Sequence, residues 1–313
     1  MTNSETTYLF SIIMPVYNKA PYIRDTISSI LNQTYSSYEI IMIGGASTDE
    51  TDSICQEYAA ENPKTFRYIT QSGKGVSTAR NDGILAAKGK YIAFLDADDI
   101  WVPKYLETMK KLIDDYPEAT FYAGGHVWKY PDGVETSRVL PITRGYIDYL
   151  KVSMDYGGLG ILNSWIIYER ERVIDVGLFK TDYIIGEDAD LATRMALSGN
   201  VAYEPMNLGT YMAELPESLC KYSTGFEVQV PGEPELCSVE QTPPIVEFHD
   251  WWLMNIALQN IDRGYPKTAR KQLGRVTNKN NKKVKLFTIL SYLPTPISSF
   301  IHQTYNKYLW RKQ

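Results

Sequence analysis

The first 130 positions of the chain alternate between two patterns of apolar residues. Short apolar runs bounded by turn residues are typical of buried strands, and apolar residues spaced three and four apart are typical of helices that bury one face. The sequence predicts strands at 9–14, 38–43, 66–70 and 91–95, and helices at 20–32 and 75–87. A further helix is expected to open at Ser47, because residues 47–50 (STDE) have the form of a capping box.

This alternation predicts an α/β fold, with a mostly parallel, buried sheet and helices on both of its faces. Ligands of such sheets bind at the carboxyl ends of the strands. Segments 15–18, 44–47 and 96–99 each follow a predicted strand. We therefore expect these three segments to meet at one edge of the sheet.

The rest of the chain predicts two further parts. Helical spacing is found at 187–198 and again at 248–261, 266–276, 285–293 and 297–310, while 223–244 has no clear period. We expect an α/β domain over 1–220, an irregular insertion over 221–246 and a helical region over 247–313.

The charge of the chain is unevenly distributed. Its formal net charge is −5, but residues 263–313 contain twelve Lys or Arg and no Asp or Glu, which leaves 20 basic and 37 acidic side chains elsewhere. Basic and aromatic residues on amphipathic helices favour an anionic membrane surface as partner. A helical hairpin with a solvated basic face is the alternative. Nucleic acid is not favoured, because no binding motif is present.

Cysteine use and the N-terminus favour a cytoplasmic protein. The three cysteines include no Cys-x-x-Cys pair, which fits a reducing compartment and leaves a Cys220–Cys237 bridge as the less favoured reading. The first ten residues are polar, and no apolar run approaches the roughly 20 residues that span a bilayer. We expect the protein to be neither secreted nor integral to a membrane.

Two acidic clusters carry the candidate chemistry. Asp96, Asp98 and Asp99 follow an uncharged strand, and such close carboxylates raise one another's pKa unless a cation neutralises them. Oxygen ligands suit Mn²⁺ or Mg²⁺, although an acidic turn that caps a helix is an equal alternative. Glu187 and Asp188 open a predicted helix, where its dipole stabilises one negative charge, and the second carboxylate suits a general base.

Other sites are not favoured. No Gly-x-Gly-x-x-Gly follows the first strand and no P-loop motif occurs, which argues against a Rossmann dinucleotide site and a P-loop. The three histidines lie far apart in the sequence, so neither zinc-ligand spacing nor a Ser/His/Asp triad is indicated.

Taken together, the motifs resemble those of the bacterial family 2 glycosyltransferases of the surface-polysaccharide type. The resemblance covers about residues 9–220 and rests on the order and spacing of the segments. They are 10–18 (FSIIMPVYN), 30–35 (ILNQTY), 47–49 (STD), 75–81 (GVSTARN) and 94–99 (FLDADD), followed by 177–179 (GLF) and 186–191 (GEDADL).

The resemblance implies a GT-A type fold and a nucleotide diphospho-sugar donor. Tyr17 would stack on the base, with Pro15 and Asn18 lining the same pocket. Arg80 would contact the nucleotide, and Asp96 would lie near its ribose and the metal.

The resemblance also implies the roles of the remaining candidates. Asp98 would ligate the Mn²⁺ or Mg²⁺ that bridges the diphosphate, together with Asp96. Asp188 would be the general base, with Glu187 beside it. The sugar would pass with inversion to a hydroxyl of a glycan or lipid-linked saccharide, in surface-polysaccharide synthesis. The protein would then work as a peripheral protein on the inner face of the plasma membrane, held through residues 263–313.

Two departures from the family pattern support an alternative. The family has one or two aspartates where this chain has Gly44 and Gly45, and a cationic segment where it has Met212 and Glu214. The alternative is a degenerate, non-catalytic protein that binds a sugar nucleotide or a glycan. It is not favoured, because both acidic clusters are present and buried carboxylates are costly without partners.

Overall fold

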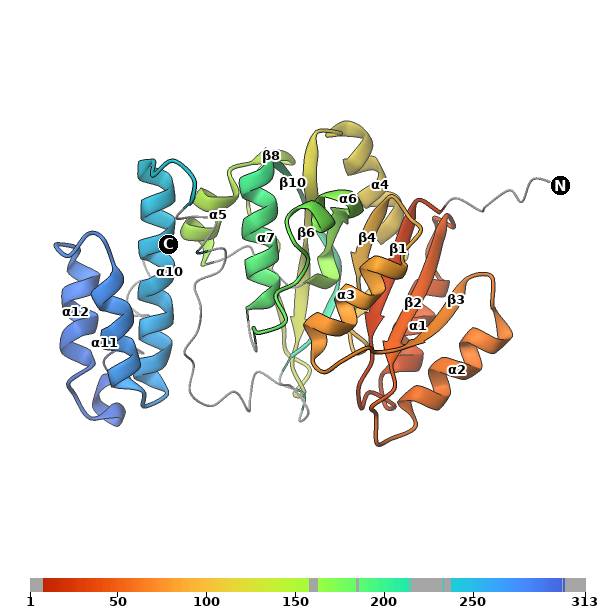
Figure 1. Ribbon diagram of the computed structural model, residues 1–313, viewed down its shortest axis with the longest axis horizontal. Coiled ribbons are helices and arrows are strands. Elements are labelled where there is room, and N and C mark those ends of the chain that lie inside the picture. Colours follow the sequence, from red (N-terminus) through yellow and green to blue (C-terminus); the bar gives the residue numbers. More distant parts are fainter. Residues whose placement is uncertain are drawn as a thin grey trace. The chain divides into compact units, whose positions relative to one another are not determined.

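A computed structural model describes residues 8–157, 163–183, 186–213, 215, 233, 238–299 and 301 of the 313-residue chain. The chain divides into two compact units, Met1–Ser218 and Leu219–Gln313, and each is described by itself (Figure 1).

The first unit is built on a ten-stranded sheet. Eight strands follow the order β3-β2-β1-β4-β9-β6-β10-β5, and the other two pair off this path, β7 with β6 and β8 with β10. The strands are β1 (Phe10–Pro15), β2 (Tyr38–Gly44), β3 (Phe66–Thr70), β4 (Tyr91–Phe94), β5 (Ile100–Trp101), β6 (Ala119–Lys129), β7 (Glu135–Ser137), β8 (Gly145–Ile147), β9 (Ile166–Glu169) and β10 (Asn200–Met212).

All four strands expected in the first 130 residues form, and they lie parallel to one another. Beyond β4 the sheet is mixed. Strand β9 lies antiparallel between β4 and β6, and β6 pairs with β10 in parallel. The α/β class is confirmed, and its parallel part carries the three segments expected at the sheet edge.

The helices of the first unit cover both faces of the sheet. They are α1 (Ile23–Leu31), α2 (Thr51–Glu61), α3 (Val76–Ala86), α4 (Tyr105–Asp115), α5 (Tyr149–Tyr156), a 3₁₀ turn at Asn163–Trp165, α6 (Arg170–Asp175) and α7 (Glu187–Ser198). Figure 1 shows α3 and α7 in front of the strands.

The strand pleat explains this division of the helices. Phe10, Ile12 and Met14 of β1 join a buried cluster with residues of α1 and α4. Ile13, which points to the opposite face, meets α3 so closely that a Cβ on Gly83 would lie 2.4 Å from its Cγ2.

The start of α2 differs from the expectation. The helix begins at Thr51, with Glu50 as its N-cap residue, rather than at Ser47, and no side chain caps it from the N-cap position. The Asp49 carboxylate instead accepts hydrogen bonds from the Thr51 N–H (3.0 Å) and hydroxyl (2.5 Å). Ser47 bonds to Asp52 instead, because its loop folds back onto the first turn of the helix.

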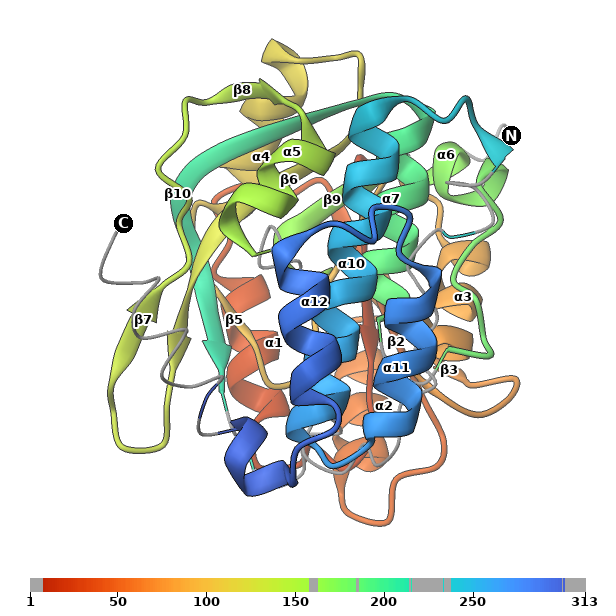
Figure 2. The same cartoon turned by 90° about the vertical axis from the view of Figure 1, so that its left-hand side faces the viewer.

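The second unit contains the helices α10 (Pro243–Asp262), α11 (Pro266–Arg275) and α12 (Lys282–Leu290), which lie side by side in Figure 2. They enclose an apolar core that includes Leu253, Ala257, Leu273 and Phe287. Helix α10 begins at Pro243, inside the range expected to be irregular, because proline suits the first helical turn. Most of 221–246, and the expected helix at 297–310 beyond residue 301, lie outside the described residues.

Candidate functional site

The turn after β1 presents the first group of candidates. Pro15 is the last residue of β1, and the Tyr17 side chain is 59% exposed. Asn18 has a φ of 51°, a left-handed conformation that asparagine tolerates better than most residues. Its amide oxygen accepts a hydrogen bond of 2.8 Å from the Thr48 N–H, which ties this turn to the one after β2.

The turn after β2 contains a carboxylate that the linear motif lacks. Asp52, on the first turn of α2, accepts hydrogen bonds from the Gly45 and Ser47 N–H groups, each at 3.1 Å. A Cβ on Gly44 would lie 2.6 Å from the Asp52 Oδ1 atom. The Asp52 carboxylate therefore fills space beside Gly44 that a side chain at position 44 would need.

Asp99 and Asp98, which follow β4, have different environments. Asp99 is buried and accepts a 2.5 Å hydrogen bond from the Ser164 hydroxyl, and burial beside Asp98 and Asp96 raises its pKa well above the usual range. Asp98 forms an ion pair with the Lys19 ammonium, with 2.6 Å between Nζ and Oδ2. Burial raises the pKa of Asp98, the Asp96 charge adds to this rise, and Lys19 opposes it.

Arg80 joins the two acidic clusters. Its guanidinium donates to Asp96 at 3.0 Å and to Glu187 at 2.7 Å, although these carboxylates lie 91 positions apart in the chain. Only 5% of the Arg80 side chain is exposed, and its guanidinium lies over the Phe179 ring, 5.4 Å from the centroid. The expected contact of Arg80 with a nucleotide stays a prediction.

Asp188 has the electrostatics of a general base that works near neutral pH. Burial raises its pKa to about 7, with a further contribution from the negative charge of Glu187, while Arg80 opposes the rise. Its Oδ1 atom accepts a 2.8 Å hydrogen bond from the Ala189 N–H at the start of α7. A base with a pKa in this range is half deprotonated near pH 7 and can both accept and release a proton.

Oxygen ligands for a hard divalent cation are present at this edge. In the part of the chain that the structure describes, no group of three His, Cys, Asp or Glu side chains is placed to hold an ion by itself. Asp96 and Asp98 fit the alternative in which one or two carboxylates bind Mg²⁺ or Mn²⁺ together with substrate phosphate oxygens and water.

The structure brings most of the candidates together. The Lys19–Asp98 pair lies close enough to Asp96 for its charge to affect Asp98, and Asp96 is linked through Arg80 to Glu187. Met212 ends β10, whereas Glu214 lies outside the described residues. Their effect on donor binding stays a prediction.

Sequence reasoning missed three residues of this edge: Lys19, Asp52 and Ser164. Lys19 follows the recognisable 10–18 segment directly, so its position was the available signal. Asp52 and Ser164 reach the edge from a helix turn and a 3₁₀ turn, and no spacing in the sequence indicates either contact.

The comparison with protein families decides the relationship. The model of Glycosyl transferase family 2 matches residues 11–171, just over half of the chain. The chain belongs to glycosyltransferase family 2.

Curated relatives agree with this membership. The chain is 37% identical over 118 residues to the minor teichoic acid biosynthesis protein GgaB of Bacillus subtilis. The matched segment covers 37% of this chain but only 13% of the length of GgaB. It is 31% identical over 199 residues to the putative teichuronic acid biosynthesis glycosyltransferase TuaG of the same organism, covering 62% of this chain and 75% of TuaG.

Solved structures confirm the expected GT-A type fold. S. aureus TarS 1–349 in complex with UDP-GlcNAc superposes with a TM-score of 0.67 at 14% identity, over 94% of this chain and 92% of that chain. The mannosyltransferase PcManGT from Pyrobaculum calidifontis, in complex with GDP-Man and Mn²⁺, gives a TM-score of 0.58 at 18% identity, over 98% and 89% of the two chains. At these identities the likeness shows the fold alone.

Proposed function

We propose that this family 2 member is an inverting glycosyltransferase. It moves a sugar from a nucleotide diphospho-sugar to a hydroxyl of a glycan or lipid-linked saccharide, in the synthesis of a cell-surface polysaccharide. The observation that carries the proposal is the Arg80 bridge, which holds the Asp96 and Glu187 carboxylates together beside Asp188. The likeness to GgaB and TuaG supports the surface-polysaccharide setting.

In the proposed reaction, Asp188 accounts for the proton and the nucleoside diphosphate is the leaving group. Asp188 takes the proton of the acceptor hydroxyl, whose oxygen forms the new bond to the anomeric carbon as the bond to the diphosphate oxygen breaks. The electron pair of that broken bond leaves with the nucleoside diphosphate. Attack from the face opposite the leaving group inverts the anomeric centre in one displacement.

The donor end of the site fits a divalent cation. Asp98 and Asp96 would hold Mn²⁺ or Mg²⁺, and a bound cation neutralises charge on the departing diphosphate. Tyr17, which is exposed and lies two residues after the end of β1, would stack on a base, with Pro15 and Asn18 lining the same pocket. TarS bound to UDP-GlcNAc and PcManGT bound to GDP-Man with Mn²⁺ support a donor of this class.

Calorimetric titration with a panel of nucleoside diphosphates, with and without Mn²⁺, tests the proposal. We expect one nucleotide to bind in a metal-dependent way, and Asp98→Ala to weaken that binding at least tenfold, because a charged ligand contact contributes about 1.5–3 kcal/mol. If no nucleotide binds under either condition, the transferase proposal is wrong, and the glycan-binding form of the non-catalytic alternative takes its place.

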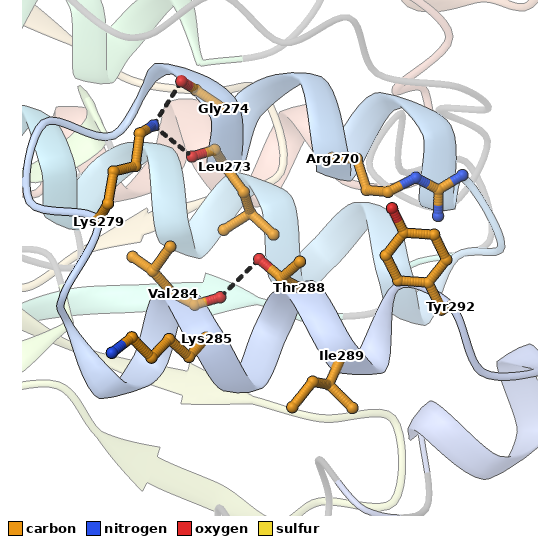
Figure 3. A pocket seen from close by; sticks show the side chains of 9 residues that line it. All are labelled: Arg270, Leu273, Gly274, Lys279, Val284, Lys285, Thr288, Ile289 and Tyr292. Atoms are coloured by element: carbon orange, nitrogen blue, oxygen red, sulfur yellow. Dashed lines mark hydrogen bonds between the residues drawn. The ribbon is translucent and has the colours of Figure 1, made fainter.

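We further propose that the second unit holds the enzyme on the cytoplasmic face of an anionic membrane. Helices α11 and α12 form a groove of about 520 Å³ with apolar residues such as Leu273, Val284 and Ile289 (Figure 3). Arg270, Lys279 and Lys285 surround it, and residues 263–313 carry no acidic side chain. The proposed association is peripheral. Among the described residues, no helix is long and apolar enough to cross a membrane.

Exposed apolar residues of the second unit make the membrane proposal testable. Ile289 is 61% exposed and Ile297 50% exposed. We expect the full-length double variant Ile289→Ser/Ile297→Ser to float with phosphatidylglycerol vesicles at least tenfold less than the wild type, because insertion of each apolar side chain contributes roughly 1.5–3 kcal/mol.

Leu85→Ser is the matched control, because Leu85 is 60% exposed but lies in the first unit. It should float like the wild type. Equal flotation of all three proteins, or equal flotation with neutral phosphatidylcholine vesicles, would contradict the membrane proposal.

A further inference from the structure

The ammonium of Lys19 forms an ion pair with Asp98, one of the carboxylates expected to bind a metal ion. The Lys19 Nζ atom is 2.6 Å from the Asp98 Oδ2 atom, and each side chain is 17% exposed. The pair is therefore largely removed from water, unlike the Lys110–Asp114 pair on α4, whose side chains are 31% and 58% exposed. Removing both charges from water costs free energy, which is offset only when the geometry of the ion pair is good.

The backbone around Lys19 is fixed, whereas its side chain can turn. The Lys19 N–H donates to the Thr51 hydroxyl at 2.7 Å, and the Ala20 N–H donates to Asp49 at 3.1 Å. These bonds hold the turn after β1 against the start of α2. The four-carbon stem of lysine nevertheless lets the ammonium change partner without moving the turn.

The ammonium and a divalent cation compete for the same carboxylate. An ammonium within hydrogen-bonding distance of Asp98 Oδ2 occupies the position from which that oxygen would ligate a metal, and the two positive charges repel each other. Metal binding at Asp98 is therefore favoured when the Lys19 ammonium moves away from Oδ2. Once displaced, it lies beside the position at which the donor's negative charge would be neutralised.

The other charged groups of the site favour a diphosphate as its second partner. Arg80 is held by Asp96 and Glu187. Met212 is uncharged at a position where the family pattern has a cation. Within the described part of the site, the Lys19 ammonium is therefore a cation that can turn toward phosphate oxygens.

We propose that Lys19 is a positioning cation with two alternating partners. In the free protein it neutralises Asp98. When the donor and a divalent cation bind, it yields Asp98 to the metal, and its ammonium contacts the donor diphosphate. This inference rests on the proposed function, because it assumes a nucleotide diphospho-sugar donor.

Lys19→Met tests the inference by two affinities that should change in opposite directions. Without nucleotide, Mn²⁺ should bind Lys19→Met about tenfold more tightly than the wild type, because its competitor is gone. With saturating Mn²⁺, the nucleoside diphosphate that the wild type binds should bind the variant about tenfold more weakly, because a charged contact is lost. Both affinities are measured by calorimetry, without turnover.

Two further variants make the result specific. Lys19→Arg keeps a cation and should stay within about threefold of the wild type in both titrations, since a charge-assisted contact is retained. Lys110→Met removes the surface pair with Asp114 and should change neither affinity. If the wild type binds no nucleoside diphosphate, the proposed function fails. If the wild type binds a nucleoside diphosphate but Lys19→Met does not change the two affinities in opposite directions, the Lys19 inference is wrong.

Discussion

Asp188→Asn is expected to lower kcat for sugar transfer at least about a hundredfold, since a positioned general base contributes about 10²–10⁴ in rate. Asparagine has nearly the same shape but cannot take the acceptor proton. The donor should still bind within about threefold, because the proposed donor contacts come from Tyr17, Asp96 and Asp98 and are unchanged. Initial rates of transfer and calorimetric donor titration measure the two effects separately.

The pH profile of the wild type provides a second measure of the same base. The pKa of Asp188 is raised to about 7, so the carboxyl is largely protonated at pH 6 and cannot accept a proton. Below that pKa, kcat/KM should rise about tenfold per pH unit, and above it the rate should level off.

Asp114→Asn is a suitable control. The Asp114 side chain is 58% exposed on α4, where it pairs with Lys110. It should leave both kcat and the pH profile unchanged. An Asp188→Asn enzyme with wild-type turnover, or a rate independent of pH between 5.5 and about 7, would remove Asp188 from the role of base.

Arg80→Met is expected to lower the free energy of unfolding by about 3–5 kcal/mol, because removal of one partner from a buried ion pair leaves a charge without compensation. The effect comes mainly from the Glu187 pair, because the Glu187 side chain is only 12% exposed. The Asp96 side chain is 39% exposed, so water screens its pair with Arg80 and that pair contributes less. Methionine fills much of the volume but supplies neither charge nor donor. The melting temperature should fall by about 10 °C, as measured by calorimetry or circular dichroism.

Arg24→Met provides the comparison for this effect. Arg24 pairs with Glu57 on the surface, where the side chains are 56% and 62% exposed. Removal of such a pair changes stability by less than about 1 kcal/mol. Equal melting temperatures for the two variants would mean that the Arg80 bridge does not hold the acidic clusters together.

The Arg80 variant should also alter the base. Because the Arg80 charge lowers the pKa of Asp188, its loss should raise that pKa and move the rising limb of the pH profile to higher pH. This shift, measured on whatever fraction stays folded, separates an electrostatic role of Arg80 from simple loss of stability.

The sequence by itself determined the parallel half of the fold and the edge of the sheet at which the candidate site lies. Strands such as β1 and β2 are continuous apolar runs, and each is followed by the segment that the sheet places at its carboxyl edge. This part is predictable because period and turn chemistry are local properties of the chain. The motif order also indicated the family, which the match over 11–171 shows.

The tertiary structure alone decided which charges meet. Arg80 pairs with Glu187 across 107 positions, Lys19 with Asp98 across 79, and Asp52 reaches the space beside Gly44 from the next helix. Strand β9 likewise inserts antiparallel beside β4. No local pattern encodes these contacts, because each depends on how separate elements pack, whereas hydrophobic periodicity fixes only which face of an element is buried.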